Sequence, residues 1–183
     1  MPPAVAHLEI ELVHREFDRL GRVEVVRPLD RHGRRVHQRN AELVAAFQKY
    51  FDVVLGLNEK ESSEIGKNLG LNTRDHSPDG LAQLGQEILK RVPVGTLVIH
   101  PTAYALAFNQ QGVSTVAGPF TPKPLITTGA GDHFNAGFCL GKLLGLDNEL
   151  SLLTGVMTSG FYVRTAKSPG VADLMGLLRD WPV

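Results

Sequence analysis

The 183-residue sequence has few of the features that indicate a function class by themselves. Cys139 is its single cysteine, which excludes an internal disulfide and any zinc site with several cysteine ligands. Its 19 basic and 19 acidic side chains balance, so no excess charge favours binding to nucleic acid or to an anionic membrane. No apolar run approaches the roughly 18 residues that span a membrane, and no signal peptide is recognisable. These absences predict a soluble protein of the reducing cytoplasm.

What is present predicts one α/β domain over residues 1–183. Hydrophobic residues make up 43% and charged residues 21%, which is typical of a globular protein. Strand-like segments alternate with helical ones, a pattern that favours a mostly parallel sheet. We expect strands at 23–26, 53–57 and 96–99 and a hairpin of 104–108 and 113–116. We expect helices at 40–51, 58–68, 79–91, 132–144, 148–164 and 171–181.

The segment 127–138 carries the most specific chemical pattern. An extended stretch leads through Gly129, Ala130 and Gly131 into a helix, so successive backbone amides can point at one anion. Asp132 stands at the mouth of this turn, where a carboxylate would repel a bound phosphate unless it accepts a proton from an attacking hydroxyl. From these four residues alone, a tight turn with Asp132 as a helix cap is an equally good interpretation.

The longer string decides between the two. Residues 128–138 read Thr-Gly-Ala-Gly-Asp-x-Phe-x-Ala-Gly-Phe, which closely resembles the C-terminal signature of the ribokinase-like, PfkB-type carbohydrate kinases. The resemblance implies a three-layer α/β/α core and transfer of the γ-phosphoryl group of ATP to a sugar or nucleoside hydroxyl. It implies that Asp132 is the general base and that Gly129, Ala130 and Gly131 supply amides to the transferred phosphoryl group.

A second segment supports the resemblance. Asn58 and Glu61, at the end of an expected strand, look like the family's Asn-x-x-Glu motif, which helps to hold Mg²⁺ largely through water. Taken alone, the pair would simply be a helix N-cap and its N3 partner. The resemblance adds Thr102 and Ser168 to the residues expected to bind the nucleotide, because segments around them border the nucleotide in relatives.

The sequence departs from the family pattern in three places. Ile126 replaces a usual aspartate, which argues against activation by a monovalent cation. His100, Pro101 and Thr102 replace a Thr-x-Gly turn that contacts phosphate, and proline removes a backbone donor there. The N-terminal sugar-binding region and lid of a complete family member are not recognisable, so we expect a core truncated on its N-terminal side.

Two hypotheses from different classes therefore stand. The chain is a PfkB-type kinase that uses ATP and Mg²⁺, or it is a non-catalytic nucleotide-binding or interaction module. A truncated kinase product that needs a partner half, or a second copy of itself, belongs with the second hypothesis. The acceptor cannot be read from this sequence.

Four further residues receive structural interpretations. We expect Cys139 to be a small buried hydrophobe and His133 to be an ordinary first-turn residue. We expect Gly137 and Gly141 to allow close helix packing rather than phosphate binding.

Overall fold

The computed structural model describes residues 46–182, all of which lie in one compact unit, Arg34–Val183. Its elements are β1 (Val54–Leu57), α3 (Glu59–Asn68), α4 (Pro78–Leu89), β2 (Thr96–Ile99), β3 (Tyr104–Asn109), β4 (Gly112–Ala117), α5 (Ala130–Leu143), α6 (Asn148–Thr165) and α7 (Val171–Arg179). The expected strand at 23–26 and the first part of the helix expected at 40–51 lie outside the described residues. That helix ends at Gln48, earlier than expected. A single domain over the whole chain stays a prediction.

The four described strands form one mixed sheet in the order β1-β2-β3-β4. β1 and β2 are parallel, with Leu57 opposite Ile99, whereas β2-β3 and β3-β4 are antiparallel. The predicted hairpin is confirmed, and Gly112 follows its turn with a φ of 136°, which favours glycine. The expectation of a mostly parallel sheet is wrong for these strands, because the hairpin contributes two antiparallel pairings.

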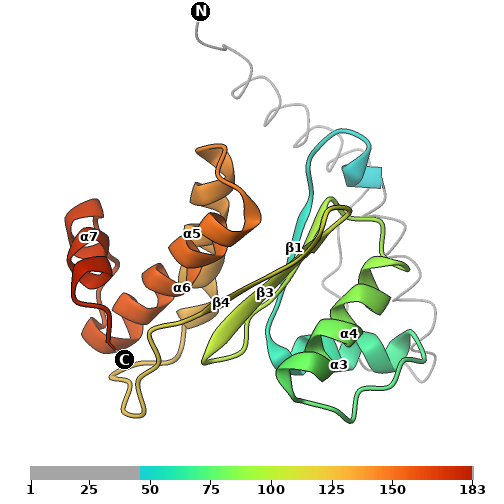
Figure 1. The fold of residues 1–183 in the computed structure, drawn as a ribbon, viewed down its shortest axis with the longest axis horizontal. Helices are drawn as coiled ribbons and strands as arrows, with labels where there is room; N and C mark the ends of the chain where they lie inside the picture. Colours follow the sequence, from blue (N-terminus) through green and yellow to red (C-terminus); the bar gives the residue numbers. More distant parts are fainter. Residues whose placement is uncertain (1–45, 183) are drawn as a thin grey trace, which may run out of the picture. The chain divides into compact units, whose positions relative to one another are not determined.

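Helices cover both faces of this sheet, as Figure 1 shows. Alternate residues of β2 divide between two core clusters, since successive side chains of a strand point to opposite faces. Leu97 and Ile99 pack with residues of α4, while Val98 packs with residues of α5 and α6. The predicted α/β/α layering is therefore confirmed for the described part of the chain.

The five helices expected from residue 58 onward are confirmed, each to within two residues at either end. Local capping explains several starts. Ser77 accepts a hydrogen bond from the Gly80 amide ahead of Pro78, and Asp147 accepts one from the Leu150 amide. The proline-containing stretch 118–129 forms neither helix nor strand, also as expected.

Helices α5 and α6 pack closely because α5 carries glycine where they meet. A Cβ at Gly137 would lie 2.7 Å from the Thr154 carbonyl oxygen, and one at Gly141 would lie 2.7 Å from the Ser151 Cα. This confirms close helix packing at both glycines. Cys139, in contrast, is exposed, so the expectation that it is buried is wrong. It lies about 200° around the helix from Gly137 and therefore faces away from α6.

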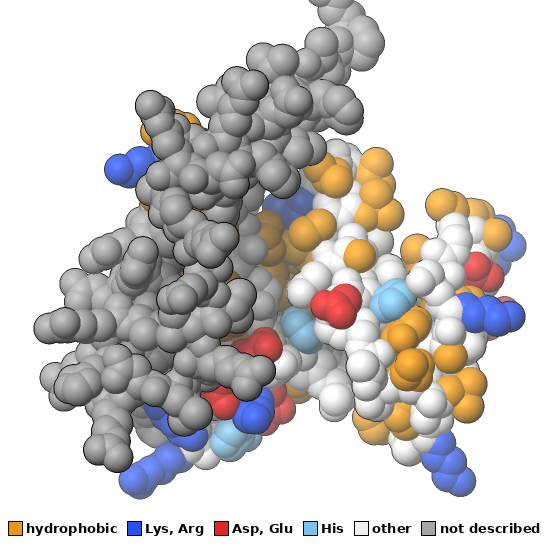
Figure 2. All heavy atoms as spheres, turned by 180° about the vertical axis from the view of Figure 1, so that it is seen from behind, with side chains coloured by type: hydrophobic (Ala, Val, Ile, Leu, Met, Phe, Trp, Pro, Cys, Tyr) orange, Lys and Arg blue, Asp and Glu red, His pale blue; other side chains and the backbone are white. Residues whose placement is uncertain are grey.

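Exposed hydrophobic side chains lie near Cys139 on the surface of α5. Leu140 and Leu143 are 44% and 86% exposed, and Figure 2 shows hydrophobic side chains on the surface over both α5 and α7. Within residues 46–182, no helix is long and apolar enough to cross a membrane.

Candidate active site

The carboxyl ends of the two parallel strands meet at one edge of the sheet. Asn58 directly follows β1 and His100 directly follows β2, and the His100 amide donates a 2.9 Å hydrogen bond to the Leu57 carbonyl. The first turn of α5 lies at the same edge, where a Cβ at Gly131 would be 3.5 Å from the His100 ring. Ligands of open α/β sheets bind outside the carboxyl ends of the strands, so this edge is the candidate site.

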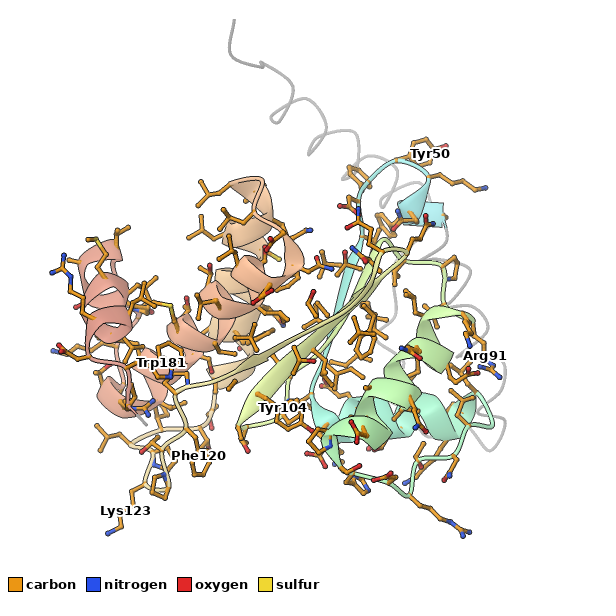
Figure 3. All side chains as sticks on the ribbon, in the orientation of Figure 1. Tyr50, Arg91, Tyr104, Phe120, Lys123 and Trp181 are labelled. Carbon is orange, nitrogen blue, oxygen red and sulfur yellow. The ribbon has the colours of Figure 1, made fainter. Side chains whose placement is uncertain are left out.

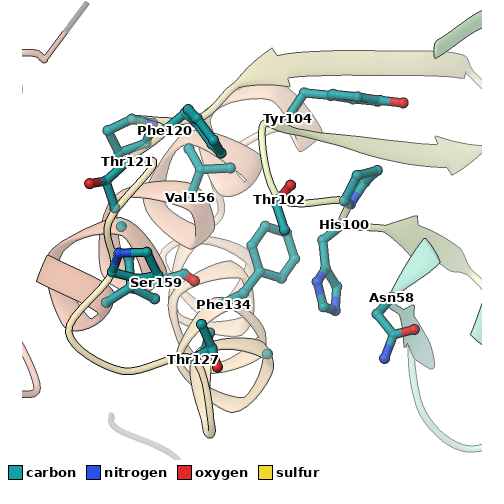
Figure 4. A pocket seen from close by; sticks show the side chains of 18 of the residues that line it. Asn58, His100, Thr102, Tyr104, Phe120, Thr121, Thr127, Phe134, Val156 and Ser159 are labelled. Atoms are coloured by element: carbon teal, nitrogen blue, oxygen red, sulfur yellow. The ribbon is translucent and has the colours of Figure 1, made fainter. Parts of the chain in front are cut away.

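A cleft of about 470 Å³ opens at this edge. Its lining comes from the residues after β1 and β2, the stretch after β4, the start of α5 and one face of α6. Figure 4 shows His100 between Phe134 and Asn58, with Thr127 at the start of the α5 turn and Ser159 on α6. Phe120 lies on the loop that closes one side, from which Lys123 points away (Figure 3). The cleft has the size and the largely apolar walls of a small-molecule site.

The turn into α5 presents backbone donors that have no acceptor in the described part of the chain. Gly129 adopts φ 86°, a left-handed conformation that favours glycine, and the Ala130 amide donates to the Thr127 carbonyl at 3.1 Å. Over residues 46–182, no acceptor is found for the amides of Gly131 and Asp132. Free first-turn amides and the helix dipole together suit an anion. Among residues 46–182 the turn thus leaves the Gly131 and Asp132 amides without an acceptor, whereas the Ala130 amide, also expected to bind phosphate, is engaged by Thr127. The phosphate-binding role predicted for Gly129, Ala130 and Gly131 stays a prediction.

The Asp132 carboxylate is exposed at the third position of α5 and makes no hydrogen bond or ion pair within the described part of the chain. It does not cap its helix, because the N-cap of α5 is Gly129 and no side chain makes a capping hydrogen bond there. The helix-cap interpretation of Asp132 is therefore wrong. A carboxylate with both oxygens free can accept a proton, which is what a general base needs.

Asn58 and Glu61 form a reciprocal capping box at the start of α3. The Asn58 side chain accepts from the Glu61 amide at 2.9 Å, and the Glu61 carboxylate accepts from the Asn58 amide at 2.8 Å. This bond uses Oε2, and no partner is found in the described residues for Oε1. Those residues also include no cluster of three or more His, Cys, Asp or Glu side chains that could hold a metal. The pair fits a Mg²⁺ held mainly through water, and does not fit direct coordination by several side chains.

The other two predicted nucleotide-binding residues lie differently. Thr102 lines the cleft, as do Asn58, Ala130 and Gly131. Ser168 does not line it, and neither do Gly129, Asp132 and Glu61. The Ser168 hydroxyl instead lies 2.9 Å from His133 Nε2.

Two side chains at this site were not identified from the sequence. His133 was expected to be an ordinary first-turn residue, yet its ring stacks on Tyr162 with centroids 3.6 Å apart. His100 was noted as part of an unusual turn, but the structure places its ring against Phe134, with centroids 4.5 Å apart. Both contacts join residues distant in sequence. The position of His133 directly after Asp132 of the motif was the one sequence feature that could have indicated a role for it.

Burial lowers the pKa of His100 from its usual value of 6.5, and the nearby Glu61 carboxylate partly opposes this shift. Well above pH 6.5 the ring is neutral in both folded and unfolded chains and contributes no pH dependence. As the pH falls below 6.5, the unfolded chain takes up a proton that the folded chain resists, so the folded state loses stability.

We therefore expect His100→Gln to reduce the loss of unfolding free energy between pH 7.5 and pH 5.5. Urea unfolding of wild type and variant at both pH values measures this, because the difference between them isolates His100 from the other titrating groups. An equal or larger loss in the variant would contradict the assignment.

The family is established by comparison with known proteins. A family profile described as prokaryotic ketohexokinase matches residues 25–181, which is most of the sequence. The chain belongs to this ketohexokinase family. A ketohexokinase of Haloferax volcanii is 30% identical to it over 146 residues, which are 80% of this chain and 38% of that protein. This ketohexokinase-family chain thus spans well under half the length of that curated relative.

Solved structures show the same fold. Arabidopsis thaliana ribokinase, complexed with ribose and ATP, superimposes with a TM-score of 0.61 at 18% identity, covering 78% of this chain and 53% of that one. Thermotoga maritima ribokinase gives a TM-score of 0.58 at 23% identity, covering 73% of this chain and 43% of that one. The ketohexokinase-family chain therefore has a ribokinase-like α/β fold, as its signature at residues 128–138 predicted.

Proposed function

We propose that this chain carries the nucleotide-binding and catalytic part of an ATP-dependent ketohexokinase. One observation carries the proposal: in a chain of the ketohexokinase family, the first turn of α5 lies beside a cleft and carries an Asp132 carboxylate and Gly131 and Asp132 amides that have no partner among residues 46–182. Because the chain spans 38% of its curated relative, the activity of the whole protein and its ketohexose acceptor are both part of the proposal.

In the proposed reaction, the acceptor hydroxyl oxygen attacks the γ-phosphorus of ATP. A new O–P bond forms, the bond from the γ-phosphorus to the β–γ bridging oxygen breaks, and its electron pair stays on ADP. Asp132 accepts the hydroxyl proton. The amides of Gly131 and Asp132 stabilise the negative charge on the phosphoryl oxygens, a type of stabilisation that is often the largest catalytic contribution.

Asn58 and Glu61 are the residues proposed to hold Mg²⁺, mainly through water, and Glu61 Oε1, which has no partner among residues 46–182, would accept from such a water. A bound Mg²⁺ would neutralise phosphate charge. Thr102 lies in the cleft lining and is therefore proposed to contact the nucleotide. Ser168 is proposed to act indirectly, through His133. With Ile126 in place of a carboxylate, no requirement for potassium is expected.

The alternative is a nucleotide-binding or interaction module without catalysis. The exposed hydrophobic side chains on α5 are the observation that favours it, because uncovered apolar surface often marks an interaction site. Light scattering measures the oligomeric state of the chain. A stable dimer would support the interaction module, and a monomer would argue against it.

Nucleotide binding is tested by thermal shift with ATP and with ADP, each with and without Mg²⁺. At a hundred times the dissociation constant a ligand adds about 2.7 kcal/mol, which for a domain of this size raises Tm by about 5–10 °C. Gly131→Val is the matched variant, since its added methyl groups enter the space between the α5 turn and His100. We expect magnesium-dependent stabilisation of the wild type and loss of it in the variant.

An unchanged Tm at millimolar nucleotide would overturn the proposed function and favour the non-catalytic alternative. If ATP or ADP stabilised Gly131→Val as much as the wild type, the nucleotide would have to bind away from the α5 turn.

A further inference from the structure

His133 is held by three contacts at the start of α5. Its Nδ1 lies 2.8 Å from the Gly129 carbonyl oxygen, its Nε2 lies 2.9 Å from the Ser168 hydroxyl, and its ring stacks on Tyr162. The interplanar angle of the stack is 13°, so the two rings lie nearly parallel. The ring thereby connects the α5 turn to α6 and to the segment that precedes α7.

The hydrogen-bonding partners determine the tautomer of His133. A carbonyl oxygen can only accept, so the proton must be on Nδ1, and this N–H donates to Gly129. In the neutral ring Nε2 then accepts, and the Ser168 hydroxyl is its donor. Both ring nitrogens are thus engaged within the protein. His133 is therefore not free to bind a phosphate oxygen while these contacts hold.

Tyr162 holds the neighbouring carbonyl. Its hydroxyl donates a 3.0 Å hydrogen bond to the Thr128 carbonyl oxygen, and a Cβ at Gly129 would lie 3.3 Å from that hydroxyl. Two successive carbonyls of the turn therefore accept from side chains, and that of Gly129 also accepts from the His133 backbone amide at 3.1 Å. Because each peptide group is planar, fixing the carbonyls of Thr128 and Gly129 also fixes the amides of Gly129 and Ala130, which directly precede the Gly131 and Asp132 amides.

We propose that His133, as its neutral Nδ1–H tautomer between Tyr162 and Ser168, is a positioning residue that fixes the turn presenting the Gly131 and Asp132 amides. This inference deepens the proposed function and rests on it where nucleotide affinity is concerned. It also explains where Ser168 acts, because this hydroxyl reaches the phosphate-binding turn through the His133 ring and does not line the cleft. The family signature leaves position 133 open, so this connection is a property of this chain's own residues.

The first arm of the test needs no nucleotide. We expect the ¹⁵N spectrum of His133 at pH 7.5 to show a pyrrole-type Nδ1 and a pyridine-type Nε2. We also expect His133→Phe, which keeps the stack and loses both hydrogen bonds, to accelerate hydrogen exchange of the Ala130 amide about tenfold. His133→Asn should restore slow exchange, because its amide group can donate in place of Nδ1.

The second arm measures ADP affinity by calorimetry in the full 183-residue chain. His133→Phe should weaken binding about tenfold, which is roughly 1.4 kcal/mol, whereas His133→Asn should stay within about threefold of wild type. Ser168→Ala should give an intermediate loss. His76→Phe is the matched control, since His76 is a half-exposed histidine outside the cleft lining whose Nδ1 pairs with Glu59.

The two arms separate the inference from the proposed function. A wild type that binds no ADP but shows the expected tautomer and exchange would overturn the function and leave the positioning role supported. A protonated Nε2 in the neutral ring would overturn the positioning role. The positioning role would also be overturned if His133→Phe showed the same Ala130 hydrogen exchange and the same ADP affinity as the wild type.

Discussion

Asp132→Asn is expected to lower kcat by about 10²–10⁴-fold while leaving nucleotide affinity nearly unchanged. The carboxylate makes no hydrogen bond in the described part of the chain, so its loss removes proton acceptance without disturbing packing or the backbone turn. Asparagine has nearly the same shape and cannot serve as the base. ADP release at saturating ATP and fructose measures kcat, and calorimetry with ADP measures affinity.

The matched control for this variant is Asp147→Asn. Asp147 is another exposed carboxylate at a helix start, where it caps α6 by accepting from the Leu150 amide. Asparagine caps a helix about as well as aspartate, so this variant should keep both rate and stability. Full activity in Asp132→Asn would remove Asp132 from the proposed mechanism. A rate loss accompanied by an equal loss of ADP affinity would point to a binding role instead.

Phe134→Ala is expected to lower the free energy of unfolding by about 3–5 kcal/mol. Phe134 is 3% exposed and fills the junction of β2, α5 and α6, where the His100 ring stacks on it. Gly155 of α6 approaches it so closely that a Cβ there would lie 2.9 Å from the Phe134 ring. Truncation would therefore leave a cavity between packed elements. Urea unfolding at pH 7.5 measures the change.

Phe120→Ala is the stability control for Phe134→Ala. Phe120 is 55% exposed on the loop after β4, so the same truncation should change the free energy of unfolding by no more than about 0.5 kcal/mol. A cost below about 1 kcal/mol for Phe134→Ala would mean that the site collapses without a cavity. His100 would then need another support for its position at the cleft.

Local chemistry allowed most of the described elements to be predicted. The capping groups of Asn58 and Asp147, Gly112 after its turn and the prolines after β4 act within a few residues, so their effects can be read along the chain. The glycines of α5 were predictable as packing positions because they recur four residues apart, on one face of the helix. The sheet is mixed and not mostly parallel because the expected hairpin adds two antiparallel pairings.

The part of the candidate site that lies in one contiguous sequence motif was predictable. The Gly129–Asp132 turn and its carboxylate follow from eleven consecutive positions, 128–138, that resemble a family signature. His133 and Ser168 are 35 positions apart, and Tyr162 lies on another helix, so no local pattern indicated that they meet. Cys139 was misassigned because its apolar neighbours in sequence do not define which face of α5 is covered.

The sequence by itself determined the alternation of elements, the helix starts and the identity of the motif, because these depend on interactions within one or two turns of chain. Tertiary structure alone decided that His100 stacks on Phe134 beneath the α5 turn, and that His133 joins this turn to Ser168. Such contacts depend on how strands and helices from distant parts of the chain are brought together at the carboxyl ends of β1 and β2, which packing against both faces of the sheet fixes.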